Sequence, residues 1–270
     1  MGEKKRRTVP LRETYSQAAI HQRWHQEYRQ DSWQRAFDDE IYDLLFQVLK
    51  PAGAWADVGC GSGERTVQLA RRCPAVIGVD ISPEILPVAA ALAASQGLDR
   101  KAEFRCCAVE ELSGIKAENV HCRGVLMHVP DWRTALDNLC RIVAPGGCLV
   151  LFEGNCRSVE ALVVRIAHRL LKRASKLTSS DGGLEFWTES NGVPFVVRMA
   201  DLNRLERHMA SKGFTVVLRR PVQCLDVARF PAALRRAVAL LNRAWFRLGL
   251  PFGSGTILAA RKAGSQPLSA

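Results

Sequence analysis

The chain has 270 residues, of which 47% are hydrophobic and 24% are charged, so its composition excludes a chain that is disordered throughout. Its formal net charge of +11 leaves RNA, an anionic membrane and an anionic lipid-like acceptor as candidate partners. The nine cysteines form no CxxC pair, no apolar run approaches the ~18 residues of a membrane span, and no signal peptide is evident. These features exclude a disulfide framework and predict a cytoplasmic protein.

Residues 14–49 are polar with apolar side chains at helical spacing. The apolar positions in 41–48 follow the i, i+3, i+4, i+7 pattern, so the segment predicts two helices with a break near residues 30–33. His21 and His25 are spaced i, i+4 on the first of these helices, which is the spacing of a metal pair. The sequence supplies no third ligand, and we therefore predict no metal site.

Strands and helices alternate over the next hundred residues. Short apolar or β-branched runs predict five strands, at 54–58, at 76–80, at 102–106, within 120–126 and at 148–153. Helical patterns lie between them, at 64–72, from 82 onward and at 131–143. Ser82 and Pro83 are typical of a helix start, and Pro87 is expected to kink the helix that follows. The alternation predicts a mostly parallel sheet with helices on both faces.

The alternation is interrupted after the fifth predicted strand. Residues 155–197 read as an insertion with its own helix and a turn at 181–183. The pattern then resumes with a helix at 201–212, a strand at 214–219, a helix within 221–254 and a last strand at 255–261.

The most informative segment is the glycine loop DVGCGSG, residues 57–63, which leaves a predicted strand and enters a predicted helix. Glycines at such a turn let the backbone approach a ligand, and the helix N-terminus offers free N–H groups. A dinucleotide fingerprint needs G-x-G-x-x-G, but Glu64 stands three positions after Gly61. Asp80, at the end of the second strand, can accept both hydroxyls of a ribose.

Five motifs in this order resemble the class I S-adenosylmethionine-dependent methyltransferases, in particular their type 11 branch. They lie at 57–63, 78–82, 104–112, 124–130 and 144–148. The resemblance covers about residues 14–156 and implies S-adenosyl-L-methionine as the cofactor. It also implies an α/β fold with a doubly wound, Rossmann-like sheet of seven strands, mostly parallel, whose last strand is antiparallel.

With this resemblance the chain divides into a lid, a core, a cap and a tail. The expected parts are an N-terminal helical lid at 1–50, a cofactor-binding core at 51–154, a cap insertion at 155–198, the C-terminal part of the core at 199–263 with a basic helix at 231–249, and a tail at 264–270.

The resemblance also implies which positions contact the cofactor: Asp57, Gly59, Cys60, Gly61, Gly63, Asp80, Ile81, Ala108, Val109, Glu110 and Arg123. Ile81 would cover one adenine face, and Val109 would meet the adenine edge through its backbone. Ala108 stands where the family usually has an Asp for the adenine amine, and Glu110 or backbone carbonyls are the substitutes. The backbone carbonyl of Arg123 would receive the amino group of the cofactor.

His128 and Glu153 are the candidate catalytic residues. His128 lies beyond the fourth strand, near the expected methyl position, and Glu153 lies at the carboxyl end of the fifth strand. The sulfonium is already a good leaving group, so alignment supplies up to roughly 7–11 kcal/mol and a base is needed mainly for a hydroxyl acceptor. A packing role for His128 remains the alternative.

Positive charge is concentrated in two segments. Residues 157–176 carry six cations against one carboxylate, and residues 219–247 carry seven against one, so together they hold the whole excess. Each segment has an expected apolar stripe opposite its cations: Val159, Val163, Ile166, Leu170 and Leu177 in the first, and Leu234, Val238, Leu241, Trp245 and Leu248 in the second. The segments are expected at the mouth of the site, either as a lid with its stripe in the core or as a surface for an anionic membrane or lipid-like acceptor.

The sequence therefore predicts a methyltransferase that acts on an oxygen of a small-molecule or lipid-linked acceptor, such as a quinone, polyketide or glycan precursor, by in-line transfer. Peripheral contact with an anionic membrane would run through 159–177 and 231–249. Carbon or nitrogen methylation of a small molecule, RNA methylation and a non-catalytic cofactor-binding scaffold are the alternatives. RNA is disfavoured because residues 123–128 contain neither an Asn/Asp-Pro-Pro-aromatic nor a Pro-Cys motif.

Overall fold

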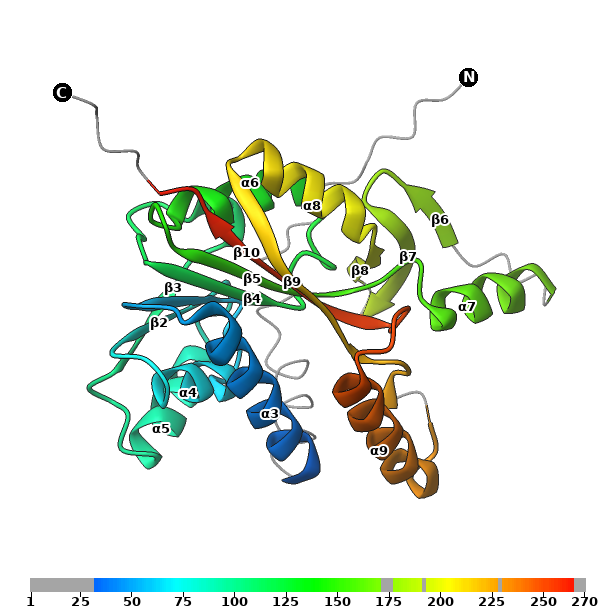
Figure 1. Ribbon diagram of the computed structural model, residues 1–270, viewed down its shortest axis with the longest axis horizontal. Helices are drawn as coiled ribbons and strands as arrows, with labels where there is room; N and C mark the ends of the chain where they lie inside the picture. Colours follow the sequence, from blue (N-terminus) through cyan, green and yellow to red (C-terminus); the bar gives the residue numbers. More distant parts are fainter. Residues whose placement is uncertain (1–31, 171–176, 191–192, 228–229, 265–270) are drawn as a thin grey trace.

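The computed structural model describes residues 32–170, 177–190, 193–227 and 230–264. The first predicted helix, with His21 and His25, lies outside these residues. A seven-stranded sheet with the order β3-β2-β1-β4-β5-β10-β9 forms the centre of the molecule (Figure 1). Its strands are β1 (Trp55–Val58), β2 (Val76–Asp80), β3 (Ala102–Cys106), β4 (Asn119–Arg123), β5 (Cys148–Gly154), β9 (Phe214–Gln223) and β10 (Gly255–Lys262).

The strand directions confirm the predicted fold class. The pairs among β1 to β5 are parallel, whereas β10 runs antiparallel to both of its neighbours, β5 and β9. The chain order reverses at β1, where β2 and β3 lie on one side and β4 and β5 on the other. In open α/β sheets a ligand binds outside the carboxyl ends of the strands at such a switch point.

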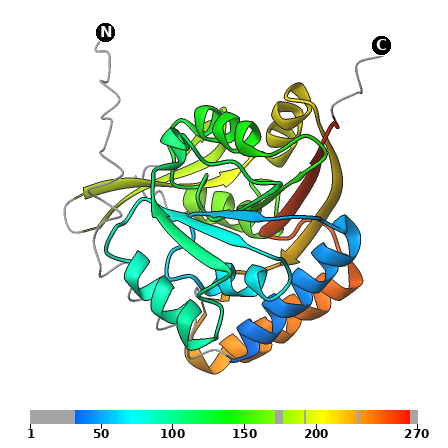
Figure 2. The same cartoon turned by 90° about the vertical axis from the view of Figure 1, so that its left-hand side faces the viewer.

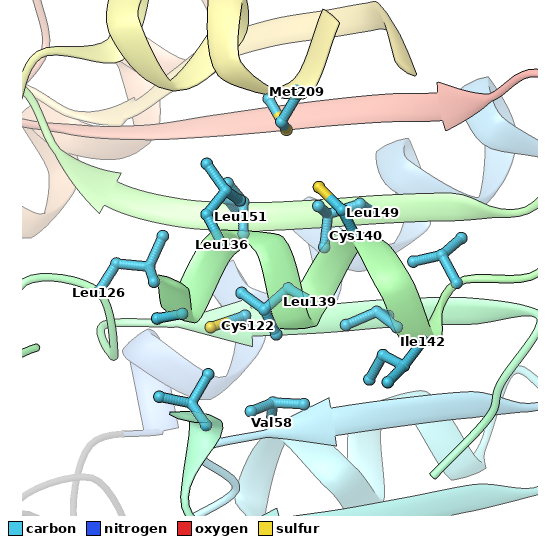
Figure 3. Packing of buried hydrophobic residues seen from close by; sticks show 14 of the residues in the cluster. Val58, Cys122, Leu126, Leu136, Leu139, Cys140, Ile142, Leu149, Leu151 and Met209 are labelled. Carbon is cyan, nitrogen blue, oxygen red and sulfur yellow. The ribbon is translucent and has the colours of Figure 1, made fainter. Parts of the chain in front are cut away.

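Helices cover both faces of the sheet (Figure 1). One face carries α6 (Trp132–Ile142) and α8 (Leu202–Ser211), and the other carries α3 (Ser32–Leu49), α4 (Glu64–Ala70), α5 (Leu86–Ser95) and α9 (Ala232–Leu248). Successive side chains of a strand point to opposite faces of the sheet, so they pack alternately against the two helical layers. In β5, Leu149 and Leu151 join the cluster under α6 and α8, whereas Val150 and Phe152 join the cluster over α3. Figure 3 shows side chains of the first cluster converging from α6, α8 and the strands.

The insertion after β5 contains more structure than predicted. It holds α7 (Val159–Leu170) and a three-stranded antiparallel sheet of β6 (Leu177–Ser180), β7 (Gly183–Ser190) and β8 (Val193–Ala200). Leu177, expected on a helical stripe, is the first residue of β6. Alternate apolar side chains of β7, Leu184 and Phe186, pack with Cys156 and Ala161, so this small sheet buries one face against the start of α7.

The expected kink at Pro87 is wrong. The helix begins at Leu86 rather than at Pro83, so Pro87 lies in its first turn. A backbone N–H has no intrahelical acceptor there, and the missing donor of proline costs nothing.

The expected stripe of the second basic segment is wrong as well. In α9 the buried residues are Val238, Asn242 and Phe246, while Leu234, Leu241 and Leu248 are exposed. Phe246 packs edge-on against Phe37 of α3, with 5.4 Å between ring centroids, and Figure 2 shows α3 and α9 side by side. The contact with α3 therefore decides which face of α9 is buried.

The first basic segment also departs from its expected stripe. In α7 only Glu160 and Ala161 are buried, and Val159, Val163, Ile166 and Leu170 are exposed. The interpretation that both apolar stripes enter the core is therefore wrong.

Candidate functional site

The glycine loop between β1 and α4 has a conformation that side chains other than glycine resist. Gly59, Gly61 and Gly63 have φ values of 77°, 51° and 86°, in the left-handed region. A Cβ at Gly59 would lie 2.0 Å from Cγ2 of Val125, whereas a Cβ at Gly61 would meet no atom within 4 Å. Gly59 therefore permits a close internal approach, and Gly61 borders open space at the carboxyl end of β1.

Asp80 ends β2, the strand beside β1, and its carboxylate faces this loop. One oxygen accepts a hydrogen bond from the backbone N–H of Gly61 at 2.8 Å, and the other accepts from that of Ser82 at 3.0 Å. The residue is 6% exposed, so the two amides hold a nearly buried carboxylate at the switch point. Open space at Gly61 next to a fixed carboxylate fits the ribose end of an adenosine ligand.

Asp57 lies behind the loop rather than on its ligand side. Its two oxygens accept from the Thr66 hydroxyl at 2.6 Å and pair with Nδ1 of His121 at 2.7 Å. A carboxylate can only accept, so Nδ1 carries a proton, and Nε2 makes a hydrogen bond with the Tyr42 hydroxyl at 3.1 Å. Asp57, His121, Thr66 and Tyr42 are all buried, so the network ties α3, β4, β1 and α4 together beneath the loop.

The sequence analysis missed the partners of Asp57. The available signal was His121, a polar residue in the middle of the otherwise apolar strand β4, because a buried polar group needs a partner. Tyr42 carried no such signal, since it lies within the apolar pattern of α3.

The expected adenine side of the site follows β3. Ala108 and Val109 are buried, and a short 3-10 helix spans Val109–Glu111. The side-chain amide of Asn138, on α6, donates to the carbonyl oxygens of Val109 at 3.1 Å and Glu110 at 2.7 Å. Burial raises the pKa of Glu110. Asn138 therefore fixes the backbone of this turn. Ile81, the other residue expected at the adenine, follows Asp80 and is half-buried.

Arg123 ends β4 and is held from two sides. Its guanidinium lies 4.9 Å above the ring of Phe152 and donates to Asp38 of α3 at 3.1 Å. The second oxygen of Asp38 pairs with Arg65, in the first turn of α4, at 3.1 Å. Asp38 is fully buried, so this double ion pair anchors α3 next to the carboxyl ends of β1 and β4.

The candidate catalytic residues are both buried: His128 lies beyond the end of β4, and Glu153 is the second-to-last residue of β5. Burial lowers the pKa of His128 and raises that of Glu153 to about 8. Within the described part of the chain, neither Glu153 oxygen makes a hydrogen bond of ordinary geometry. At neutral pH the pair is therefore a neutral imidazole and a mostly protonated carboxyl group.

The tautomer of His128 follows from its neighbour. Nδ1 lies 3.1 Å from the backbone carbonyl oxygen of Val196 in β8. A carbonyl oxygen can only accept, so Nδ1 carries the proton and Nε2 keeps the lone pair. His128 thus has the protonation state of a general base at neutral pH.

Arg198 is a residue of the site that the sequence analysis missed. It is 3% exposed, and its guanidinium donates to the carbonyl oxygens of Leu126 and Val129 at 2.9 Å and of Pro130 at 3.2 Å. Glu185 of β7 balances its charge at 2.9 Å. One residue of β8 therefore holds the loop that carries His128. A lone arginine in a β-rich segment gave no sequence signal for this contact.

Taken together, the sheet brings the glycine loop, Asp80, Arg123, His128 and Glu153 to its carboxyl edge, because each follows or ends a parallel strand. Ala108, Val109 and Glu110 follow β3 on the same edge. Asp57 is the exception, since its side chain is used inside the fold.

Residues 56–151 match a family model described as a methyltransferase domain, of the type 11 branch. A ubiquinone biosynthesis O-methyltransferase of Xanthomonas axonopodis is 35% identical over 107 residues, which are 38% of this chain and 44% of that protein. The human mitochondrial ubiquinone biosynthesis O-methyltransferase is 36% identical over 148 residues, 51% of this chain and 40% of that protein. The match thus spans less than half the length of each of these curated relatives.

Solved structures support the fold. The structure of magnesium protoporphyrin IX methyltransferase from Synechocystis, determined with bound S-adenosylhomocysteine, aligns with a TM-score of 0.63. The alignment covers 94% of this chain and 98% of that one at 15% sequence identity. At this identity the similarity shows a shared fold across almost the whole chain.

Proposed function

We propose that this chain methylates an oxygen atom of a small-molecule or lipid-linked acceptor. It belongs, through residues 56–151, to the class I S-adenosylmethionine-dependent methyltransferases of the type 11 branch. The observation that carries the proposal is the left-handed glycine loop with open space at Gly61, next to the fixed carboxylate of Asp80. This arrangement suits an adenosine-bearing ligand at the switch point of the sheet.

Each part of the edge has a proposed role in holding the cofactor. Asp80 would accept the ribose hydroxyls, Ile81 and the backbone at Val109 would enclose the adenine, and the Arg123 carbonyl would receive the amino group. When bound, S-adenosyl-L-methionine supplies a methyl group on a positively charged sulfur. The chain's own contribution is then alignment of the acceptor with that methyl group.

In this proposal His128 and Glu153 have different roles toward the acceptor: one removes its proton and the other orients it. Neutral His128, with its lone pair on Nε2, takes the proton from an acceptor hydroxyl. Glu153, protonated at neutral pH, donates a hydrogen bond to an acceptor oxygen and so orients it. Arg198 positions His128 through the loop of residues 126–130 without touching the acceptor.

The acceptor class rests on the relatives. Two similar proteins are named ubiquinone biosynthesis O-methyltransferases, which supports a quinone-type aromatic hydroxyl as the acceptor. Carbon or nitrogen methylation of a small molecule is the second candidate, and a non-catalytic cofactor-binding scaffold is the third.

Within the described ranges, no helix is long and apolar enough to span a membrane. For a lipid-linked acceptor we propose a peripheral contact with an anionic membrane in the region of residues 159–177 and 231–249.

Incubation of the full chain with methyl-labelled S-adenosyl-L-methionine and a panel of phenolic quinone precursors tests the proposal. We expect S-adenosylhomocysteine to form in step with a labelled methyl ether, and kcat to fall in His128→Gln while cofactor affinity is unchanged. Label on carbon or nitrogen would support the second candidate. Cofactor binding without turnover on the panel or on a cell extract would support the scaffold, and absence of cofactor binding would overturn the proposal.

A further inference from the structure

The outer face of α7 is apolar, and the described residues leave it exposed. Among the described residues, five large apolar side chains of this one helix are about half exposed or more: Val159, Leu162, Val163, Ile166 and Leu170. Leu170 reaches 74% exposure. We refer to these five residues as the α7 face. A patch of this kind on one short helix is unusual for a surface that meets only water.

A neighbouring loop extends the α7 face. The backbone N–H of Val159 donates to the carbonyl oxygen of Phe252 at 3.2 Å, which joins the start of α7 to the loop of residues 249–253. Phe252 is 61% exposed at a φ of 63°, and Leu250 beside it is 37% exposed. A bulky residue resists this backbone region, so the fold holds an exposed aromatic side chain in an uncommon conformation.

The exposed arginine and carboxylate positions of α7 itself have one sign. Arg165 and Arg169 are exposed on α7 itself. The only carboxylate of that helix, Glu160, is buried and accepts from the backbone N–H of Asp226 at 3.2 Å. Exposed apolar side chains next to exposed arginines, without an exposed carboxylate on the helix, complement an anionic apolar boundary.

We infer that the α7 face, with Leu250 and Phe252, is the docking surface for an anionic lipid bilayer. The helix lies in the plane of the interface, its apolar side chains enter the boundary of the acyl chains, and Arg165 and Arg169 contact lipid phosphates. The inference rests on the proposed function and deepens it, because α7 is the next element after β5, the strand that carries Glu153, and would bring the catalytic edge to a lipid-borne acceptor.

A second copy of the chain on the α7 face and a lipid site on α9 both fit the charges less well. A second copy docked symmetrically on this face would bring the arginines of the two copies together without a carboxylate between them. The arginines of α9 are a weaker lipid site than their number suggests, since Arg243 and Arg247 pair with Glu40 of α3.

Co-sedimentation of the full chain with vesicles tests the inference. The vesicles are phosphatidylcholine alone, or phosphatidylcholine with phosphatidylglycerol, each at low and high salt. The apolar variant is L162Q/I166Q/F252N, in which Asn suits the left-handed backbone of position 252. Its control is Val88→Gln on α5, a comparable exposed apolar residue at the opposite end of the molecule (Figure 1).

We expect the native chain and V88Q to bind the anionic vesicles and to lose that binding in high salt. The triple variant should bind at least about tenfold more weakly, since each buried apolar side chain contributes substantially to partitioning. Arg165→Gln with Arg169→Gln should weaken binding about 30-fold at about 1 kcal/mol per cation. Arg100→Gln, a control at an exposed arginine after α5, should have no effect.

Several outcomes overturn the inference: no vesicle binding by the native chain, equal loss in V88Q, or a native dimer that the triple variant dissolves. Binding of the cofactor by calorimetry and the circular dichroism spectrum are measured on every variant. Vesicle binding without methyl transfer would contradict the proposed function alone, and methyl transfer without vesicle binding would contradict the docking surface alone.

Discussion

Asp80 combines two structural bonds with its proposed contact to ribose. Its carboxylate accepts the backbone N–H groups of Gly61 and Ser82, so it orients the glycine loop as well as facing the ligand side. A substitution at this position therefore removes a charged acceptor from both.

We predict that Asp80→Ala weakens the binding of S-adenosyl-L-methionine by about 1.5–3 kcal/mol, the scale of a hydrogen bond to a charged group. Asp80→Asn keeps one oxygen acceptor and should lose less. Isothermal titration calorimetry on the two variants measures both values. Unchanged affinity in Asp80→Ala would remove this residue from the site.

Glu153 is a buried carboxyl group whose surroundings favour the protonated form. Burial raises its pKa to about 8, against an ordinary value of about 4.5, and the nearby Arg198 only partly offsets this. Between these two pH values the folded chain binds one more proton at this position than the unfolded chain. The free energy of unfolding therefore falls as pH rises through this window.

We predict that Glu153→Gln, which is neutral at every pH, removes this dependence. At pH 8.5 the variant should be more stable than the native chain, by on the order of a few kcal/mol, and the difference should shrink toward pH 5. Urea unfolding followed at several pH values measures it. A constant difference across the range would show that the carboxyl group titrates normally.

At the level of elements, α3 is held by carboxylates that reach three neighbours. Asp38 pairs with Arg65 and Arg123, and Glu40 pairs with Arg243 and Arg247 of α9, the latter at 2.8 Å. Apolar side chains of the helix, among them Ile41 and Leu45, are buried below the sheet. Residues 32–49 therefore pack as part of the layer under the sheet, and the predicted division of the chain into lid, core and cap stays a prediction.

Because Glu40 neutralises part of α9, we predict that Arg243→Gln with Arg247→Gln changes stability more than membrane affinity. The loss should be about 1 kcal/mol, since both pairs are partly exposed, and it should decrease as salt is added. Thermal unfolding at two ionic strengths measures the loss, and vesicle co-sedimentation supplies the comparison. A large loss of vesicle binding with unchanged stability would contradict the ion pairs.

At the scale of the whole molecule, the seven cations of residues 219–247 overstate the positive charge that this segment offers to a partner. Arg219 pairs with Glu206 at 3.1 Å, and the guanidinium of Arg220 donates to backbone carbonyl oxygens at the end of α9. Cations in the second basic segment are thus partly used within the fold. On α7, in contrast, Arg165 and Arg169 are exposed beside the apolar face.

Helix α7 is also less firmly packed than the central sheet. Only Glu160 and Ala161 of α7 are buried, whereas α3, α6 and α8 each bury several large side chains. Regions with few buried contacts open locally at low free-energy cost.

We therefore predict that, within the described residues, trypsin cuts first after Arg165 and Arg169. Limited proteolysis read by mass spectrometry tests this order, and anionic vesicles should slow these two cuts. Earlier cleavage after Arg141 of α6, in the packed layer, would contradict it.

The sequence by itself determined the features that depend on neighbouring residues. Alternating runs placed β1 to β5 and β10 within a few residues, the glycine loop fell between a strand and a helix, and Asp80 fell at a strand end. The periodicity of apolar side chains and the hydrogen bonding of turns depend on residues close in sequence, so short segments are enough to predict these features. Parallel strands then bring the ends of separate segments to one edge.

Only the tertiary structure decided the features that need a distant partner. A helical wheel predicted a buried face of α9 with Leu234, Leu241 and Leu248. Contact with Phe37, more than two hundred residues away in sequence, instead buries the face with Phe246. The partners of Asp57 come from β4 and α4, and Arg198 reaches the His128 loop from the cap. Burial and ion pairing depend on what packs opposite a side chain, and a local pattern does not contain that information.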